Sequence, residues 1–295
     1  MPFQPSWTLT PLMIRHINAI ERTVGLLQFV RMRPERTTDS RINDALSSVQ
    51  IEGNRLTMEA AVRLARERPD DMALDDDARE FLNYLNTFDQ FDHLRDLREQ
   101  GVRVGDVLNL HRSVVQGVRG GDRFAGQLRR EDVRVGDVEE SGEIIVHHQP
   151  PHWSRVEDEL RDLVDWINRS FEKPARREIK RGAEDPWVHP VVIAGIAQHR
   201  LAWIHPFVDG NGRTARMFTT LLLYGRGYDF KYLFDLSSYC DHYYAALRAA
   251  DLDGDYTRWL EYFMGGFARD MYRIRERAAG AGEMVVPSIT KAPEG

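Results

Sequence analysis

Residues 205–216 read His-Pro-Phe-Val-Asp-Gly-Asn-Gly-Arg-Thr-Ala-Arg, and they combine an imidazole, a carboxylate, two glycines and two guanidinium groups in one short segment. Gly210 and Gly212 flank Asn211, and glycine lets the backbone adopt positive φ, so successive N–H groups can point at one anion. Apolar side chains recur at helical spacing after Gly212, and the N-terminus of a helix attracts negative charge. The segment therefore predicts a site for phosphate groups.

The charged side chains of this segment indicate what kind of phosphate site it is. Arg213 and Arg216 lie three positions apart, hence on neighbouring helix surface, where each guanidinium can bind phosphate oxygens bidentately. Asp209 would repel bare phosphate unless it holds Mg²⁺, which prefers carboxylate and phosphate oxygens. His205 can accept a proton near neutral pH, and we expect it to be a general base. The pattern predicts a magnesium–nucleotide site with a base at its edge.

The same segment resembles the signature of the Fic family of protein adenylyltransferases, His-x-Phe-x-(Asp/Glu)-Gly-Asn-Gly-Arg-x-x-Arg, at every fixed position. The resemblance implies an enzyme that binds Mg-ATP and moves AMP to a Ser, Thr or Tyr hydroxyl of a target protein or of itself, releasing pyrophosphate. His205 would then deprotonate the hydroxyl, and Asp209 would hold the metal.

The resemblance also assigns the remaining residues of the motif. Asn211 and the backbone of Gly210 and Gly212 would stabilise charge on the transferred α-phosphate. Arg213 and Arg216 would bind the distal phosphates that leave with pyrophosphate.

A second segment, residues 48–53, reads Ser-Val-Gln-Ile-Glu-Gly and fits the Ser/Thr-x-x-x-Glu-(Gly/Asn) pattern of the inhibitory helix of this family. By itself the pattern is equally typical of a helix in which Ser48 and Glu52 are an i,i+4 pair and Gly53 is the C-cap. The resemblance implies that Glu52 pairs with Arg216 in the place of the γ-phosphate, so that ATP binds weakly or in a nonproductive pose. Replacing Glu52 should then raise automodification.

A third segment has the period of strands. Residues 131–136 and 143–147 are two short β-branched runs around a polar turn, which predicts a hairpin. Members of the family carry such a flap, preceded by Gly-x-x-Arg as at residues 126–129 and followed by a Pro-containing stretch as at 148–151. Its free edge could pair with an extended segment of the target, although an ordinary surface hairpin is the alternative. The flap residues expected to bind the target are Val133, Arg134, Val135, Ile144, Ile145 and Val146.

Two features near the flap and downstream of the motif concern other ligands. His147 and His148 do not predict a metal site, because adjacent strand residues face opposite sides and no further ligand lies at suitable spacing. Residues 243–247, Tyr-Tyr-Ala-Ala-Leu, resemble a family helix whose aromatic side chain and following polar residue lie near the adenine, here Tyr244 and Asp251. Members often have Asn at the second position, and a carboxylate cannot donate to a ring nitrogen as an amide can. Base preference therefore stays open.

The fold class expected is mainly α, a Fic-type helical bundle with a short β-hairpin flap over the active site. Apolar residues recur at three- and four-residue spacing and predict helices at residues 10–32, 40–51, 57–67, 75–97, 104–116, 152–170, 189–203, 212–226, 240–250 and 256–277. We expect an N-terminal helical region with the inhibitory helix at residues 1–95, a Fic catalytic domain at 96–278 and a flexible tail at 279–295.

The composition limits the kinds of molecule that the protein is expected to bind. The 295 residues include 40 Lys and Arg against 46 Asp and Glu, and this net charge of −6 gives no electrostatic case for binding nucleic acid. Cys240 is the only cysteine, which excludes an internal disulfide and fits a reducing cytoplasm. Charged residues interrupt the first apolar stretch, so neither a signal peptide nor a membrane span is expected. The expected partners are ATP and a protein substrate, with a homodimer left open.

Three functions fit this pattern. The first is transfer of AMP from ATP to a protein hydroxyl, inhibited by Glu52. The second uses the same site either to remove AMP from a modified protein, with Glu52 positioning water, or to transfer another phosphate-bearing group. The third is a nucleotide-sensing binding module without catalysis, which the intact His205 argues against. Removal needs Glu52 and transfer is hindered by it, so opposite responses to Glu52→Gly separate the first two.

Overall fold

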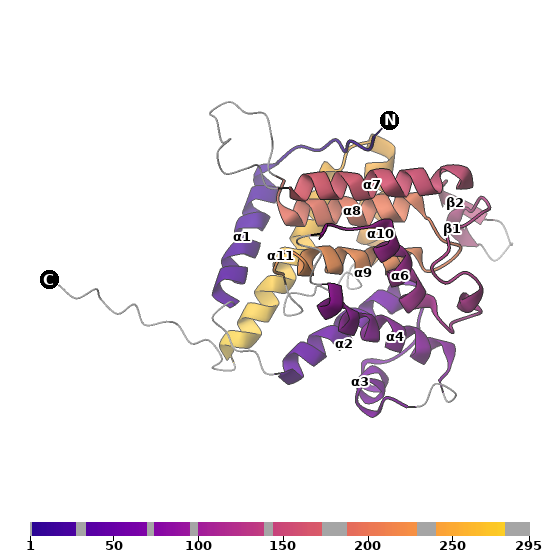
Figure 1. Cartoon of the computed structure of the whole chain (residues 1–295). Helices are drawn as coiled ribbons and strands as arrows, with labels where there is room; N and C mark the ends of the chain where they lie inside the picture. Colours follow the sequence, from indigo (N-terminus) through magenta and orange to yellow (C-terminus); the bar gives the residue numbers. More distant parts are fainter. Residues whose placement is uncertain are drawn as a thin grey trace.

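The computed structural model of the protein describes residues 2–27, 34–69, 74–94, 100–138, 144–172, 188–228 and 240–280. In this part of the chain the fold is mainly α with one antiparallel two-stranded sheet, as predicted (Figure 1). The α-helices are α1 (Pro11–Leu27), α2 (Pro34–Ile51), α3 (Met58–Glu67), α4 (Asp76–Thr87), α6 (Val104–Val115), α7 (Val156–Phe171), α8 (Pro190–Ile204), α9 (Asn211–Tyr224), α10 (Cys240–Asp253) and α11 (Thr257–Gly280), and short 3₁₀ helices are η2 (Phe88–Leu94), η3 (Gly121–Arg123) and η4 (Trp153–Arg155).

Local sequence signals explain where several helices begin. The side chains of Thr57 and Asp75 accept hydrogen bonds from backbone N–H groups in the first turns of α3 and α4. In α8, His189 is the N-cap. Pro190 follows it at the first helical position, where proline is favoured. The helix predicted at residues 75–97 is α-helical only to Thr87, whose hydroxyl donates to the carbonyl oxygen of Asn83, and η2 continues to Leu94.

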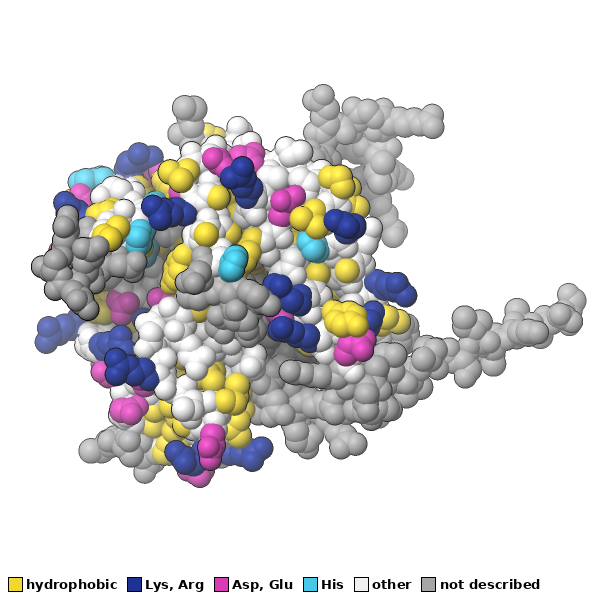
Figure 2. All heavy atoms as spheres, turned by 180° about the vertical axis from the view of Figure 1, so that it is seen from behind, with side chains coloured by type: hydrophobic (Ala, Val, Ile, Leu, Met, Phe, Trp, Pro, Cys, Tyr) yellow, Lys and Arg dark blue, Asp and Glu magenta, His cyan; other side chains and the backbone are white. Residues whose placement is uncertain are grey.

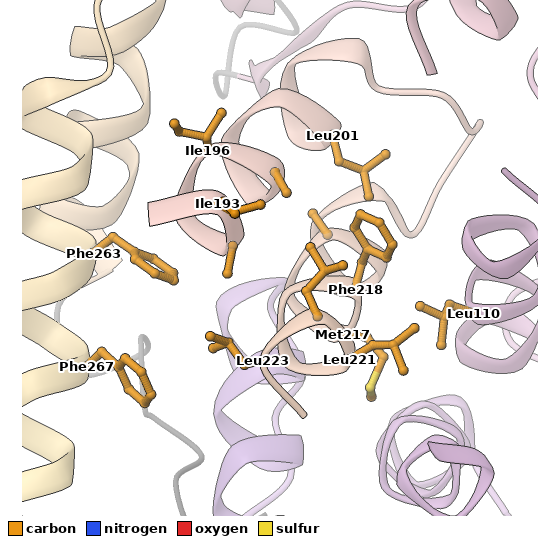
Figure 3. Close-up of a cluster of buried hydrophobic side chains, with 14 of the residues drawn as sticks. Leu110, Ile193, Ile196, Leu201, Met217, Phe218, Leu221, Leu223, Phe263 and Phe267 are labelled. Carbon is orange, nitrogen blue, oxygen red and sulfur yellow. The ribbon is translucent and has the colours of Figure 1, made fainter. Parts of the chain in front are cut away.

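The core surrounds α8 and α9. Helix α8 packs against α7, α9 and α11, which explains why its sequence is apolar around the whole circumference. Figure 3 shows side chains of α11 directed toward the α8–α9 pair. Each such side chain contributes about 1.5–3 kcal/mol when fully buried. Fully buried members of this cluster include Ile193, Ile196, Phe218, Leu221, Phe263 and Phe267.

The helices before residue 95 pack on the same core as those that follow. Helix α1 lies along α11, and α2 contacts both α4 and α9 (Figure 1). The N-terminal segment is also tied to the turn before α11, because the backbone N–H of Tyr256 donates to the carbonyl oxygen of Ser6 at 2.8 Å. The division into regions 1–95 and 96–278 stays a prediction, and most of the predicted tail, residues 281–295, lies outside the described residues.

The predicted hairpin is present, with its first strand shifted along the chain. Strand β1 (Val135–Val138) pairs antiparallel with β2 (Ile144–His148), and Gly136 lies opposite Val146. Residues 131–134 are not part of β1, because Asp132 accepts instead from the backbone N–H of Trp153 at 2.9 Å. The turn was expected at residues 137–142. Asp137 and Val138 instead belong to β1, and residues 139–142 lie outside the described residues.

Two surface properties bear on partners. On the face shown in Figure 2, basic and acidic side chains are interspersed, and neither sign dominates. Among the helices that the structure describes, none combines the length and the apolar character needed to cross a bilayer.

Candidate active site

The loop between α8 and α9 carries the predicted motif, and its shape depends on two left-handed residues. His205 is the C-cap of α8 with φ 50°, and Gly210 is the N-cap of α9 with φ 77°. Asn211 closes the loop, because its side-chain oxygen accepts from the backbone N–H of Phe207 at 2.9 Å and its amide donates to the carbonyl oxygen of Phe207 at 3.0 Å. Asn211 is therefore used within the loop, in addition to any role toward phosphate.

Arg129, the arginine of the Gly-x-x-Arg segment, fixes the loop to the base of the hairpin. Its Nε donates to the carbonyl oxygen of His205 at 2.8 Å, and Nη1 donates to the carbonyl oxygen of Glu131 at 2.9 Å. A further bond from Nη2 reaches the carbonyl oxygen of Pro151, beyond β2. The side chain is fully buried. One guanidinium therefore satisfies backbone acceptors from three segments, which the planar fork of arginine makes possible.

His111 of α6 contacts two residues of the loop, Phe207 and Asp209. Its ring stacks on Phe207 with centroids 3.7 Å apart and planes 2° from parallel. The backbone N–H of Gly126 donates to Nδ1 at 2.9 Å, so Nε2 carries the proton and donates to the carbonyl oxygen of Asp209 at 3.0 Å. Burial lowers the pKa of His111 to about 4, which keeps it in this neutral form. No sequence pattern predicted a role for His111, because its partners come from distant segments.

His205 has the protonation state that a general base requires. Its Nδ1 lies 3.2 Å from the carbonyl oxygen of Ala202, which can only accept, so Nδ1 carries the proton and Nε2 is left unprotonated. Burial lowers the pKa of His205 to about 4. The imidazole is therefore neutral near pH 7 and able to accept a proton at Nε2.

A cavity of about 600 Å³ opens beside this ring, a volume typical of small-molecule sites. It brings together predicted residues from four separate parts of the chain. Those of the predicted site residues that line it are Glu52, Val135, His205, Gly212, Arg216, Tyr244 and Asp251. Asp209, Gly210, Asn211 and Arg213 belong to the same loop and helix start but are not among the lining residues.

The expected pair between Glu52 and Arg216 is formed inside this cavity. Nη2 of Arg216 lies 2.7 Å from Oε1 of Glu52, and the side chain of Arg216 is only 6% exposed. Ser48 completes the contact, because its hydroxyl accepts from Nε at 2.7 Å and its carbonyl oxygen accepts from Nη2 at 2.8 Å. A Cβ on Gly212 would overlap Oε1 of Glu52. The carboxylate thus lies against the bare backbone at the start of α9.

The end of α2 places Glu52 in this position. The backbone N–H of Asn54 donates to the carbonyl oxygen of Val49, and that of Gly53 donates to the carbonyl oxygen of Gln50. This pair of bonds is the Schellman motif, in which the residue after the C-cap is left-handed. Gly53 fills that position with φ 92°. Gly53 is therefore required by backbone geometry, and Glu52 is the C-cap residue whose side chain leaves the helix end.

The two arginines of the motif have different partners. Whereas Arg216 lines the cavity, Nη1 of Arg213 lies 2.5 Å from Oε1 of Glu80, and its Nη2 lies 3.2 Å from Oδ2 of Asp209. Oδ1 of Asp209 accepts from the backbone N–H of Gly210 at 2.6 Å. Although the side chain of Asp209 has two partners, it is 52% exposed and can still be reached by an ion.

The donor set around Asp209 fits magnesium bound together with phosphate. Among the described residues no cluster of three or more His, Cys, Asp or Glu could hold an ion by protein alone. Mg²⁺ commonly takes one or two carboxylates and completes its octahedron with phosphate oxygens and water. The carboxylate of Asp209, which an ion can reach and which lies beside the predicted phosphate site, matches that requirement.

The far side of the cavity contains the residues predicted to lie near the base. Both Tyr243 and Tyr244 line the cavity, but Tyr244 is 47% exposed and Tyr243 is buried. Oδ1 of Asp251 lies 3.3 Å from Nε2 of His199, and Oδ2 lies 3.6 Å from Nδ1 of His148. Burial raises the pKa of Asp251. The two histidines were not predicted, and they show that the carboxyl group of Asp251 is part of a polar cluster.

The hairpin forms one wall of the cavity through Val135 and Gly136. Ile145 and Val146 of β2 are more than 40% exposed, which is unusual for such apolar side chains. Within the described sheet each strand pairs only with the other, so each has one edge without a strand partner. Val133 and Arg134 precede β1, and the side chain of Ile144 lies outside the described residues.

Sequence comparisons agree with this geometry. The sequence pattern of the Fic/DOC family matches residues 102–223. Protein adenylyltransferase Fic of Drosophila willistoni is 29% identical over 187 residues, which are 61% of this chain and 31% of that protein. Protein adenylyltransferase fic-1 of Caenorhabditis elegans is 29% identical over 161 residues, 55% of this chain and 26% of that protein. The chain spans about a third or less of the length of these curated relatives.

Solved structures show the same fold. A Fic family protein from Desulfovibrio desulfuricans G20 has a TM-score of 0.73 and 25% identity, and the match covers 97% of this chain and 79% of that one. A Fic domain containing signaling protein from Bacteroides thetaiotaomicron has a TM-score of 0.70 and 21% identity, covering 90% of this chain and 97% of that one.

Proposed function

The chain belongs to the Fic family, and from this premise we propose that it is a protein adenylyltransferase that transfers AMP from Mg-ATP to Ser, Thr or Tyr hydroxyls of a target protein and of itself. We propose further that Glu52 inhibits this transfer. The observation that carries both statements is the position of the Glu52 carboxylate, which lies against Gly212 and Arg216 in the cavity that His205 lines.

The reaction would proceed in line at the α-phosphate. The target hydroxyl oxygen bonds to the α-phosphorus, the bond from that phosphorus to the oxygen bridging to the β-phosphate breaks, and pyrophosphate leaves. Nε2 of His205 takes the hydroxyl proton, for which its neutral state is suited. The backbone N–H groups of Asn211 and Gly212 at the start of α9 would stabilise charge on the α-phosphate, together with that of Gly210, which is bonded to Oδ1 of Asp209 in this structure.

Phosphate binding rests first on Arg216, because it is the motif arginine that lines the cavity. We propose that Arg213 acts beside it on the departing phosphates and on the carboxylate of Asp209, to which it is already bonded. When bound, Mg²⁺ would neutralise charge on the phosphate oxygens. Asp209 is the residue that would hold it.

Inhibition follows from competition for the same donors. The guanidinium of Arg216 is already bonded to Glu52 and Ser48, so a γ-phosphate would have to displace the carboxylate before it could bind there. The carboxylate also lies at the positive end of α9, where it repels a second anion. ATP would therefore bind weakly, or with its triphosphate turned away from the orientation that transfer requires.

The walls of the cavity suggest how substrates are placed. The unpaired hairpin edge would bind an extended segment of the target through its backbone and bring the hydroxyl to His205. Contact of Tyr244 and Asp251 with the base remains a prediction, as do the cytoplasmic location and a homodimer.

A second candidate function is removal of AMP from a modified protein. The observation in its favour is that the carboxylate of Glu52 and the ring of His205 line one cavity, where a water molecule could be held between them. In that case Glu52 is required for activity and is not an inhibitor.

The decisive experiment compares Glu52→Gly with the unaltered protein in magnesium and ATP labelled at the α-phosphate. We expect increased label on the protein itself after Glu52→Gly, and no label when γ-labelled ATP is used, because the γ-phosphate leaves in pyrophosphate. The same change at Glu59, which is exposed on α3, is the matched control and should have no effect. Adding His205→Ala to Glu52→Gly should abolish labelling.

The outcomes separate the alternatives. No gain after Glu52→Gly would refute inhibition by Glu52. If an AMP-modified protein loses its label with the unaltered chain and keeps it with Glu52→Gly, removal is the function. Label that persists without His205 would refute the role of the imidazole as base.

A further inference from the structure

A buried carboxylate from the N-terminal region binds the first arginine of the motif. Glu80 of α4 is 2% exposed, and its Oε1 lies 2.5 Å from Nη1 of Arg213, whose side chain is 3% exposed. The other arm of this guanidinium, Nη2, lies 3.2 Å from Oδ2 of Asp209. Arg213 therefore joins a buried carboxylate on one side to a half-exposed carboxylate on the other.

The second oxygen of Glu80 is bonded to the segment that carries Glu52. Nδ2 of Asn54 donates to Oε2 of Glu80 at 2.7 Å and to the carbonyl oxygen of Asp77 at 2.9 Å. Asn54 is itself buried, and it ends the turn that follows α2. One continuous series of contacts thus runs from Asn54 through Glu80 and Arg213 to Asp209.

We propose that Glu80 is a positioning residue for the metal–nucleotide site: it fixes the guanidinium of Arg213, which holds the carboxylate of Asp209 in one orientation, and Asn54 connects this pair to the end of α2. The inference rests on the proposed function, because it concerns how Asp209 is held for a cation. It assigns to α4 a part in the site that the motif alone does not contain.

Geometry favours positioning over general stabilisation. A buried ion pair gains little over well-packed apolar side chains, because both charges lose their hydration. Here, however, the pair has a use that apolar side chains could not supply, since the guanidinium of Arg213 lies within ion-pair distance of two carboxylates at once, those of Glu80 and Asp209. Groups that orient metal ligands commonly change metal affinity tenfold or more when they are removed.

The position of Asn54 has a consequence for regulation. Glu52 bonds to Arg216 directly, and Asn54 supports Arg213 through Glu80, although the two residues lie in the same turn. The turn therefore contributes Glu52, which would oppose phosphate binding, and Asn54, which would help to hold the carboxylate of Asp209 for the metal. Removing the carboxylate of Glu52 alone should release the site, whereas moving the whole turn away should release the phosphate position and loosen Asp209.

The test measures metal affinity directly. In the Glu52→Gly background, we would titrate Mn²⁺ into the protein with a nonhydrolysable ATP analogue and follow free Mn²⁺ by electron paramagnetic resonance. Glu80→Gln should raise the dissociation constant of Mn²⁺ about tenfold. Binding of the analogue without metal should change less than twofold. Glu159→Gln is the matched control, because Glu159 is a buried carboxylate with two arginine partners, Arg155 and Arg200.

Glu80→Asp covers the case in which Glu80→Gln does not fold. It keeps a counter-charge for Arg213 but is one methylene shorter, so the contact with both Arg213 and Asn54 cannot be kept, and Mn²⁺ affinity should again fall. Unchanged Mn²⁺ affinity in a folded Glu80 variant would overturn the proposal, as would an equal loss in Glu159→Gln. If the Glu52→Gly parent itself binds neither Mn²⁺ nor the analogue, the proposed function fails at the same time.

Discussion

At the scale of single residues, the chemistry depends on which ring nitrogen of His205 carries the proton. The carbonyl oxygen of Ala202 holds that proton on Nδ1, and burial keeps the ring neutral. His111 is fixed in the opposite tautomer, because Gly126 donates to its Nδ1. One histidine is thus arranged to accept a proton and the other to support the loop, and backbone groups alone make the difference.

The pKa of His205 predicts the acid limb of the pH–rate profile. Because burial lowers this pKa to about 4, kcat/KM for AMP transfer by the Glu52→Gly variant should not fall through loss of this base between pH 8 and 6. It should decline as the pH approaches 4, where Nε2 becomes protonated. Initial rates at constant ionic strength with α-labelled ATP measure this. A limb centred near pH 6.5, the ordinary value for histidine, would contradict the structure.

At the scale of elements, the end of α2 links backbone geometry to the proposed inhibition. Gly53 has φ 92° and no atom within 4 Å of a Cβ built on it, so a side chain there meets no steric obstacle beyond the backbone itself. A left-handed conformation costs a residue other than glycine about 1–2 kcal/mol. Gly53→Ala should therefore lower the free energy of unfolding by about that amount and raise automodification, because Glu52 is held less firmly.

Gly25 in α1 provides the matched control for this change. It is also open around Cβ, but its φ is ordinary, so Gly25→Ala should stabilise the protein by about 0.5–1 kcal/mol. Urea denaturation of both variants measures the difference. If Gly53→Ala is as stable as the unaltered protein, the left-handed helix end does not constrain Glu52.

The bounds of the helices and strands show how much of the fold could be predicted from the sequence alone. The helix predicted at residues 57–67 is found almost unchanged, because Thr57 supplies a cap and the apolar spacing is regular. The start of the first hairpin strand was predicted four residues too early, since Val133 and Val135 alternate with polar residues as in a strand, whereas Asp132 bonds to the segment before α7. The alternation of apolar and polar residues predicts a strand, but it cannot show that a residue bonds to a segment outside the sheet instead.

At the scale of the whole molecule, the site is made from segments that are far apart in sequence. Glu52 and Arg216 are separated by 164 positions, and their pairing could be predicted only through resemblance to a family. Glu80 could not be predicted even in that way, because a lone Glu on an amphipathic helix looks like a solvated residue until Arg213 of α9 and Asn54 are brought against it. The motif could be identified because its residues are contiguous, whereas the residues that support it are not.

Buried neutral histidines predict how stability depends on pH. His111 and His199 are 0% and 3% exposed, and burial lowers the pKa of each to about 4. In the unfolded chain the pKa is about 6.5, so the unfolded state binds more protons between these values. The free energy of unfolding should therefore be highest above pH 6.5 and fall as the pH drops toward 4, by at most about 1.4 kcal/mol per pH unit for each histidine.

Urea unfolding at pH 7 and pH 5 measures this dependence. His199→Asn should reduce the difference between the free energies of unfolding at the two pH values, since one of the buried histidines with a lowered pKa is removed. The same change at His152, whose side chain is 56% exposed, is the control and should leave the difference unaltered. Equal free energies of unfolding at pH 7 and pH 5 would contradict the neutral, buried state of both rings.

The missing side chain of Gly212 has a consequence for how strongly Glu52 could inhibit AMP transfer. Because the carboxylate of Glu52 and the nucleotide would use the same uncovered backbone, Glu52 would behave as a tethered ligand whose effective local concentration is set by the end of α2. The degree of restraint would then depend on that effective concentration and on the concentration of ATP, each relative to the dissociation constant of its own contact. Such a chain would respond to cellular energy status gradually, without a second binding site.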